Sequence, residues 1–178
     1  MRNLLGQFQF LRVDLTNFHN YALDFRMKLD ELDKHLLAAL QKDAHITADA
    51  LGQKLNLSPS QAGRRRQRLE AAGLIAGYTA KLDPKKLGLS VQAFVQVQMA
   101  THDPAQVRTF AHVVDSRTDI VSAWTLTGEA DYLLRVYAED LAALNVLIHQ
   151  VLLPHPAVAR VQSQIVMDQF KADAPLPT

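Results

Sequence analysis

Hydrophobic residues early in the chain recur at the spacing of one helical face. Leucines fall at Leu29, Leu32, Leu36, Leu37 and Leu40, as expected for the buried side of an α-helix. Thr47 then offers an N-cap for a second short helix that ends near Leu55. Ser58 followed by Pro59 predicts the start of a third helix, which runs to Gly73. Three short helices with a tight second turn predict a helix-turn-helix.

The hydrophobic pattern in the second half of the chain changes from helical spacing to alternation. Residues 91–99 alternate apolar with mostly polar side chains, which predicts a half-buried strand. Asp103 and Pro104 are expected to start a helix, and Pro154 to end a second one. Further strands are expected at 120–126, 132–138 and 158–167. The order β-α-β-β-α-β is that of a ferredoxin-like α+β domain, whose uncovered sheet face predicts dimerisation.

Composition narrows the class of protein. The chain has 178 residues, of which 48% are hydrophobic, and no cysteine, so packed cores are expected but no disulfide framework or thiolate site. This fits a cytoplasmic location. Apolar stretches span only a few residues, against the roughly 20 needed to cross a bilayer, which excludes a membrane span. No metal or cofactor is expected, because His102, His149 and His155 form no recognised ligand spacing and no phosphate-binding glycine loop is present.

The near-neutral net charge conceals a local basic run. The chain carries 19 Lys and Arg against 18 Asp and Glu, a net charge of +1, yet residues 54–69 hold five basic side chains and no acidic one. This run covers the third helix, and an α-helix fits the major groove of DNA. A charge run alone is more often a solvated face, but the capped helix and tight turn before it supply the scaffold for DNA binding. The candidate DNA-binding residues are Lys54, Ser58, Ser60, Gln61, Arg64, Arg65 and Arg68.

The helical wheel divides these residues by role. Ala62, position 66 and Leu69 turn inward, because they lie at i, i+4 and i+7. Ser60, Gln61 and Arg64 then face outward near the helix start, where we expect them to meet base edges. Arg65 and Arg68, further along, are expected to contact the phosphate backbone. Arg66 occupies a core position, so we expect either that its aliphatic stem packs while the guanidinium leaves the core or that the helix is rotated slightly.

These elements divide the chain into segments with separate roles. A winged helix-turn-helix domain that binds DNA is expected at 27–83, where residues 76–82 read as extended and predict a small β wing. A linker at 84–88 leads to a βαββαβ domain for effector binding and dimerisation at 89–170, followed by a tail at 171–178. Residues 1–26 lack the features of a secretory signal. We interpret them as an extension, either disordered or the result of an assigned start codon that is too early, in preference to a functional arm.

Four motifs in order along the chain resemble the leucine-responsive and asparagine-responsive (Lrp/AsnC) transcription regulators. They are LDELDKHLLAALQKDAHIT at 29–47, LSPSQAGRRRQRLEAAGLI at 57–75, GYTAKLDPKKLGL at 77–89 and TGEADYLLRV at 127–136. The resemblance implies a winged helix-turn-helix joined to a ligand-sensing βαββαβ domain. It also implies dimers, often assembled into octamers, and amino-acid effectors bound between sensing domains of neighbouring subunits.

The resemblance carries over to individual residues. Arg65 and Leu69 match the recognition helix, whereas Arg66 replaces a usually apolar residue. Gly128 and Asp131 match the glycine and second acid of the family's effector turn, but the aromatic residue between them is missing. A Gly-containing turn exposes backbone N–H groups that suit a carboxylate, and an acid suits an ammonium group; an ordinary hairpin turn is the alternative. Trp124 is expected in the core. The candidate effector-binding residues are Thr125, Thr127, Gly128, Glu129 and Asp131.

The sequence therefore indicates a sequence-specific DNA-binding regulator of transcription, not an enzyme, that responds to a small molecule, which we interpret as an amino acid. Two alternatives stay open. The sirohaem decarboxylases resemble these regulators in both domains, and a tetrapyrrole with many carboxylates would also suit the arginines. The other alternative is an architectural DNA-binding protein that needs no ligand.

Overall fold

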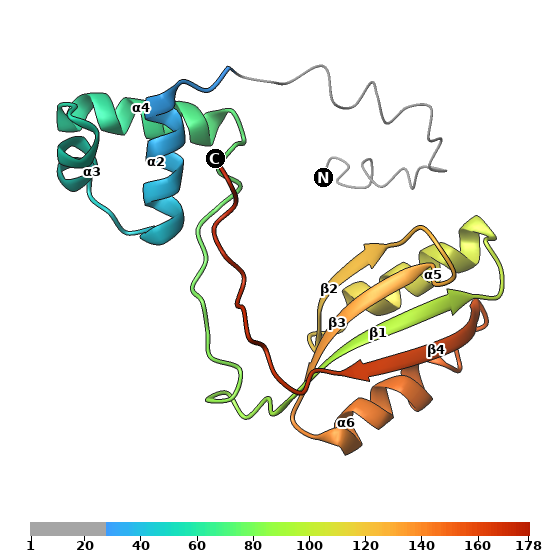
Figure 1. Ribbon diagram of the computed structural model, residues 1–178. Coiled ribbons are helices and arrows are strands. Elements are labelled where there is room, and N and C mark those ends of the chain that lie inside the picture. The colour runs from blue at the N-terminus through green and yellow to red at the C-terminus, as the bar shows by residue number, and fades with distance from the viewer. Residues whose placement is uncertain (1–27) are drawn as a thin grey trace, which may run out of the picture. The chain divides into compact units, whose positions relative to one another are not determined.

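The computed structural model describes residues 28–178, so the interpretation of residues 1–26 lies outside it. The described chain divides into two compact units (Figure 1). One holds the residues up to Thr79 together with Asp173–Thr178, and the other holds Ala80–Ala172. Of the tail predicted at 171–178, the final six residues belong to the first unit. The Gln41 side chain makes two hydrogen bonds there, accepting from the Leu176 N–H (2.6 Å) and donating to its carbonyl (3.1 Å).

Three capped helices build the first unit. Helix α2 spans Glu31–Lys42, and its N-cap Asp30 forms a reciprocal capping box with Asp33. Helix α3 spans Ala48–Leu55 and begins at the predicted cap Thr47. Helix α4 spans Pro59–Ala71, begins at the predicted cap Ser58, and adds a second capping box with Gln61. The helix-turn-helix expected from the caps and the leucine spacing is confirmed.

The core of the first unit is made of apolar side chains from the inward faces of all three helices. Ala62 and Leu69 are fully buried in it, as the helical wheel predicts. Burying such side chains contributes on the order of 1.5–3 kcal/mol each relative to leaving them exposed, so the core holds the three short helices together. The buried apolar residues are Leu36, Leu40, Ile46, Leu51, Leu55, Ala62 and Leu69.

The turn between α3 and α4 depends on a glycine that the sequence analysis did not single out. Asn56 takes a left-handed conformation (φ 53°) at the end of α3, and the Leu57 N–H donates to the Gly52 carbonyl at 2.9 Å. The backbone thereby folds back over Gly52. A Cβ on Gly52 would lie 2.7 Å from the Leu57 carbonyl oxygen and 3.3 Å from the Pro59 nitrogen. Only glycine allows this close approach.

The second unit is a four-stranded antiparallel sheet with helices on one face (Figure 1). The strands pair in the order β2-β3-β1-β4, which confirms the βαββαβ prediction. Three helical segments connect them, the last of which is a π-helix that continues α6. The elements are β1 (Val91–Met99), α5 (Pro104–Asp115), β2 (Ile120–Thr125), β3 (Tyr132–Ala138), α6 (Leu141–Val146), η2 (Leu147–Leu152) and β4 (Val158–Ile165).

The alternating residues of β1 point to the two sheet faces as predicted. Ala93, Val95 and Val97 are fully buried under the helices, while the residues between them lie on the open face. Trp124, expected in the core, lies on this open face and is 45% exposed. The register of β2 shifts between Ile120 and Ser122, and a one-residue shift moves every later side chain to the opposite face.

One further expectation differs from the structure. No strand forms at 76–82, because an extended segment needs a second strand to satisfy its N–H and C=O groups and none lies beside this one within the described chain.

The Gly52→Ala substitution should destabilise the protein by about 1–3 kcal/mol, because the added Cβ meets backbone atoms that cannot move without opening the turn. Thermal and urea unfolding followed by circular dichroism would measure the loss. Gly63→Ala is the matched control: a Cβ there meets nothing within 4 Å, so alanine should be neutral or stabilising in α4. Equal unfolding midpoints for the two variants would contradict the proposed role of Gly52.

Candidate nucleic-acid interface and effector loop

One stripe of α4 is free of internal contacts. Ser60, Arg64 and Gln67 lie at i, i+4 and i+7 and are all exposed, opposite the buried Ala62 and Leu69. The side chains of Arg64 and Gln67 form no hydrogen bond or ion pair with any residue that the structure describes. This stripe, which we call the exposed ridge (Ser60, Arg64, Gln67), is available to an external partner.

The arginines beside the ridge are bound to the carboxylates of α2. Arg65 donates from Nη1 to Asp30 Oδ2 at 2.7 Å and to Asp33 Oδ1 at 2.8 Å. Arg68 donates to Asp33 Oδ2 at 2.5 Å. The Asp33 side chain is 1% exposed, so both its oxygens are satisfied by arginines of α4. These charge-assisted bonds join α2 to α4.

The position of these two arginines bears on their predicted roles. Both were expected to contact phosphates. The Arg65 side chain is 26% exposed and held by two carboxylates, whereas the Arg68 side chain is 50% exposed and held by one. Arg68 therefore keeps guanidinium donors for a phosphate, whereas Arg65 uses Nη1 for the contact between helices and exposes less of its side chain.

The carboxyl of Asp30 is stabilised in its charged form. The hydrogen bond from the Asp33 N–H, and then that from Arg65, hold the pKa of Asp30 below its ordinary value of 3.8. A carboxyl whose pKa is lower in the folded than in the unfolded protein contributes stability above the unfolded value. That contribution is lost as the pH falls through the folded pKa.

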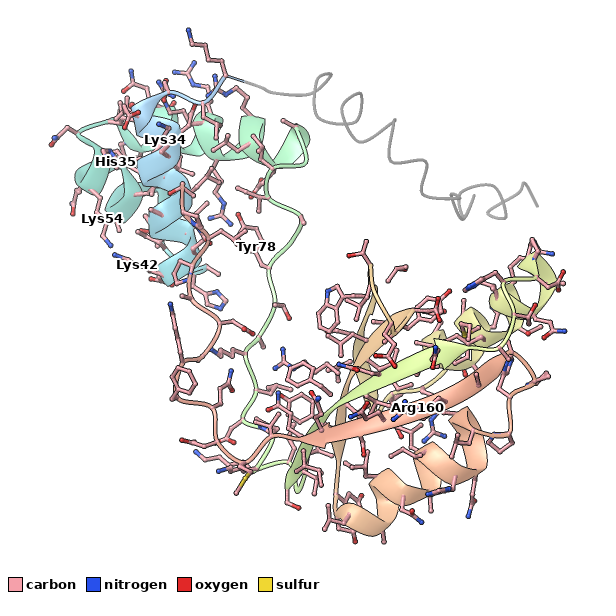
Figure 2. The ribbon with its side chains drawn as sticks, turned by 45° about the vertical axis from the view of Figure 1, so that its right-hand side comes forward. Lys34, His35, Lys42, Lys54, Tyr78 and Arg160 are labelled. Carbon is pink, nitrogen blue, oxygen red and sulfur yellow. The ribbon has the colours of Figure 1, made fainter. Side chains whose placement is uncertain are left out.

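Arg66 occupies a position that the helical wheel turns inward, and the structure shows where its charged group lies. Its guanidinium leaves the core, donates to Glu70 at 2.9 Å and lies 4.8 Å from the centre of the Tyr78 ring. The Tyr78 hydroxyl in turn donates to Glu70 at 2.7 Å. This hydrogen bond, followed by that from Arg66, lowers the pKa of the Glu70 carboxyl. Arg66 thus ties the chain after α4 to the helix (Tyr78, Figure 2).

The remaining candidate DNA-binding residues occupy the start of α4 and the end of α3. Lys54 lies in the last turn of α3 (Figure 2), exposed and without a bonded partner among the described residues. Ser58 and Gln61 are exposed but bond each other in the capping box. Sequence reasoning missed Gln67, although its spacing from Ser60 and Arg64 is the same helical signal that located Ala62 and Leu69.

The effector turn is anchored to the end of β1 by Asp131. Its carboxylate accepts from the Met99 N–H at 2.7 Å, its N–H donates to the Val97 carbonyl, and its own carbonyl accepts from Leu126. Gly128 has φ 129°, a conformation that favours glycine. Asp131 therefore organises the turn.

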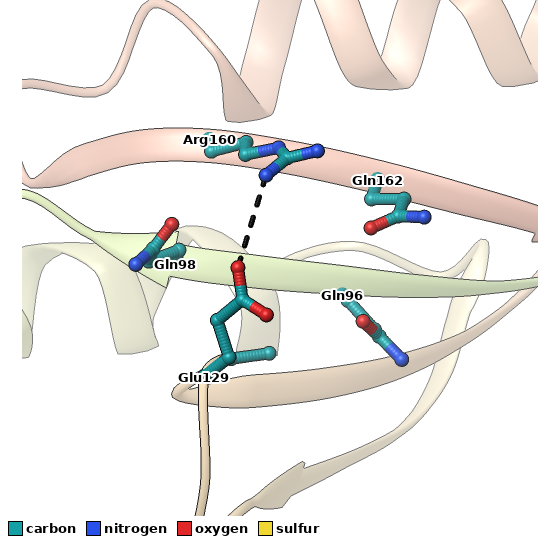
Figure 3. A pocket seen from close by; sticks show the side chains of 6 residues that line it. Gln96, Gln98, Glu129, Arg160 and Gln162 are labelled. Atoms are coloured by element: carbon teal, nitrogen blue, oxygen red, sulfur yellow. Dashed lines mark ion pairs between the residues drawn. The ribbon is translucent and has the colours of Figure 1, made fainter.

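The anchored turn places Glu129 beside a polar hollow on the open sheet face (Figure 3). In the register of β1 and β4, Gln98 lies opposite Arg160 and Gln96 opposite Gln162. Arg160 approaches Glu129 at 3.9 Å. The hollow is open to solvent and is lined by Gln96, Gln98, Glu129, Ala130, Arg160 and Gln162. We call it the polar hollow.

The other candidate effector residues lie apart from this lining. Thr125 pairs with Tyr132 at the end of β2, and Thr127 and Gly128 are exposed in the turn. Arg160 and the three glutamines were not predicted, because only the strand register brings them together. No group of three metal-ligating side chains, and no helix long and apolar enough to cross a membrane, occurs in residues 28–178.

Replacing Asp30 should make the stability of the protein less sensitive to acid. The difference in thermal midpoint between wild type and Asp30→Asn should be present at neutral pH. It should begin to shrink once the pH falls below 3.8, the ordinary pKa of the carboxyl, and should be smallest once the pH has passed through the lower pKa of the folded protein. Circular dichroism melts across this pH range measure it. Asp49→Asn, at an exposed acid in the first turn of α3, is the control. A difference independent of pH would exclude the proposed ionic role.

Both units match domains of known proteins. Residues 29–70 match the AsnC-type helix-turn-helix domain, and residues 92–176 match the Lrp/AsnC ligand binding domain. The chain is 34% identical to the DNA-binding transcriptional activator DecR of Escherichia coli over 149 residues, which cover 84% of this chain and 98% of the relative. It is also 34% identical to the leucine-responsive regulatory protein of Escherichia coli over 143 residues, covering 80% and 87% of the two chains.

Solved structures agree with this assignment. A transcriptional regulator of Neisseria meningitidis in complex with L-Met has a TM-score of 0.80 at 34% identity, over 84% of this chain and 96% of that one. An AsnC family transcriptional regulator from Agrobacterium tumefaciens has a TM-score of 0.78 at 32% identity, over 84% and 97%. Because domains, order and fold coincide over nearly the full length of these relatives, the chain belongs to the Lrp/AsnC family of DNA-binding transcriptional regulators.

Proposed function

We propose that this transcriptional regulator binds the major groove of DNA with α4, so that Ser60 and Arg64 meet base edges. The observation that carries the proposal is the exposed ridge, in which the guanidinium donors of Arg64 have no partner among the described residues. Arg64 can bond the O6 and N7 atoms of guanine in bidentate fashion. Lys54 and Arg68 contact phosphates, and Arg65 positions α4 through Asp33.

The amide of Gln61 has fewer hydrogen-bonding groups available for DNA than its outward position on the helical wheel indicates. Its oxygen already accepts hydrogen bonds from the Ser58 N–H and hydroxyl. Its NH₂ group is left to donate to a base or phosphate oxygen. Ser58 likewise acts mainly as the cap that sets the first turn of α4 against the groove. The N-terminal turn of a helix favours a nearby phosphate, because its free N–H groups carry partial positive charge.

The second part of the proposal is that an amino acid binds at the effector turn and the polar hollow. Arg160 donates hydrogen bonds to the ligand's carboxylate, and Glu129 accepts hydrogen bonds from the ligand's ammonium group. The glutamines form hydrogen bonds with polar atoms of the ligand. The pair at 3.9 Å supplies the opposite charges that a zwitterion needs. The similarity to a regulator solved with L-Met supports an amino acid as the ligand class.

The third part is that the open sheet face forms a dimer. Phe94, Trp124 and Leu133 share this face with the glutamines of β1, and exposed apolar side chains on a sheet face without helices favour a matching surface on a second copy. A dimer would place two copies of α4 in successive major grooves, about one helical turn apart, on a pseudo-palindromic site. We propose that such dimers associate into octamers. Size-exclusion chromatography with light scattering measures the size of this assembly.

Replacing Arg64 should reduce DNA selectivity, whereas replacing Lys54 should reduce affinity without changing selectivity. For Arg64→Ala, discrimination at one guanine should fall by about 1–3 kcal/mol. For Lys54→Ala, the slope of log affinity against log salt should fall by about one unit. Fluorescence anisotropy with wild-type-selected duplexes and single-base variants at several salt concentrations measures both. Binding that is indifferent to sequence and salt in the wild type would contradict the proposed function.

Among the twenty amino acids, at least one should raise the thermal midpoint of the full chain. A ligand at 100 times its Kd stabilises the native state by about 2.7 kcal/mol. Glu129→Gln and Arg160→Gln should abolish the shift because each removes one charge of the pair. Arg108→Gln is the matched control at an exposed arginine of α5. A shift that survives in both hollow variants would place the ligand elsewhere.

A further inference from the structure

Gln67 lies on the exposed ridge of α4 together with Ser60 and Arg64, the residues that we propose to contact base edges. At about 100° per residue, the side chains of the exposed ridge fall within an arc of about 60°. The buried Ala62 and Leu69 lie on the opposite side of the helix. On one flank of the arc, Arg68 is bound to Asp33, and on the other Glu70 is bound to Tyr78. Gln67 therefore lies at the free surface of the helix between two groups that have internal partners.

The chemistry of Gln67 differs from that of its neighbours. It interrupts a run of arginines at positions 64, 65, 66 and 68. A phosphate contact would be served by any cation at this position. A carboxamide instead presents one donor and one acceptor side by side, which match N7 and N6 of adenine in the major groove.

The spacing of Gln67 from Arg64 fits adjacent base pairs. Three residues along an α-helix rise about 4.5 Å, and successive bases of one strand are separated by about 3.4 Å. Two side chains on the same stripe can therefore reach neighbouring base pairs. Ser60, a further four residues toward the helix start, is about 6 Å from Arg64 and would lie over a different step.

We propose that Gln67 is a specificity-determining residue that reads an adenine next to the guanine read by Arg64. The proposal rests on the proposed function, because it assumes that α4 enters the major groove. It adds the composition of the half-site: a guanine and an adenine at neighbouring positions within each half of the operator.

The test is selection of duplexes from a randomised library by the full-length protein, followed by anisotropy titrations of single-base variants. Wild type should enrich a half-site with adjacent guanine and adenine. Gln67→Ala should lose the preference at the adenine position alone, by roughly 5- to 150-fold, while the guanine preference remains. Gln67→Arg should change the preferred base at that position from adenine to guanine. Gln53→Ala, at an exposed glutamine of α3, should leave every preference unchanged.

The outcomes separate this proposal from the proposed function. If Gln67→Ala binds all sequences more weakly by the same factor, Gln67 contacts the backbone and the proposal is wrong. If its preferences equal those of wild type, Gln67 contacts nothing, and the proposal is again wrong while the regulator remains sequence-specific. If wild type enriches no sequence, the proposed function and this inference fail together. Because Gln67 is exposed, its variants should keep the wild-type thermal midpoint, so altered preference cannot be ascribed to unfolding.

Discussion

The buried carboxylate of Asp33 determines which side chains of α4 can reach a partner. A charged group removed from water is stable only when its oxygens are bonded, and Asp33 meets this condition with Arg65 and Arg68. The burial of Ala62 and Leu69 sets the rotation of α4 that directs Arg64 and Gln67 outward, and the bonds to Asp33 hold Arg65 and Arg68 against α2. Without Asp33, Arg65 and Arg68 would lose their partner on α2, whereas Arg64 and Gln67 would stay exposed.

Local patterns predicted the helices and strands well because their causes are local. Thr47 and Ser58 cap helices through bonds within three residues, and the alternation in β1 expresses the pleat of a strand. Local patterns did not predict features that depend on a partner distant in sequence. The β wing lacked a second strand to pair with, and the shift in β2 exposed Trp124. Neither feature leaves a periodic signal in the sequence.

The candidate sites divide in the same way. The position of α4 and of the turn at Gly128 followed from motifs, whereas the bonding state of each arginine did not. Arg65 and Asp33 are 32 residues apart, and no spacing rule relates them. Arg160 likewise meets Glu129 only because β4 pairs with β1 and because Asp131 anchors the turn at the end of that strand. Contacts between residues that are distant in sequence therefore determine which of the chemically suitable side chains remain available to bind DNA or a ligand.

The basic run on α4 illustrates why a count of charges overstates the surface available to DNA. Of its four arginines, Arg65 is held by two carboxylates and Arg66 by Glu70 and the Tyr78 ring. Both stabilise the unit that presents the helix. Arg68 divides its guanidinium between Asp33 and solvent, and Arg64 alone is uncommitted among the described residues. In the proposed function, affinity and selectivity therefore depend on few side chains, whereas Arg65 and Arg66 stabilise the helix that carries them.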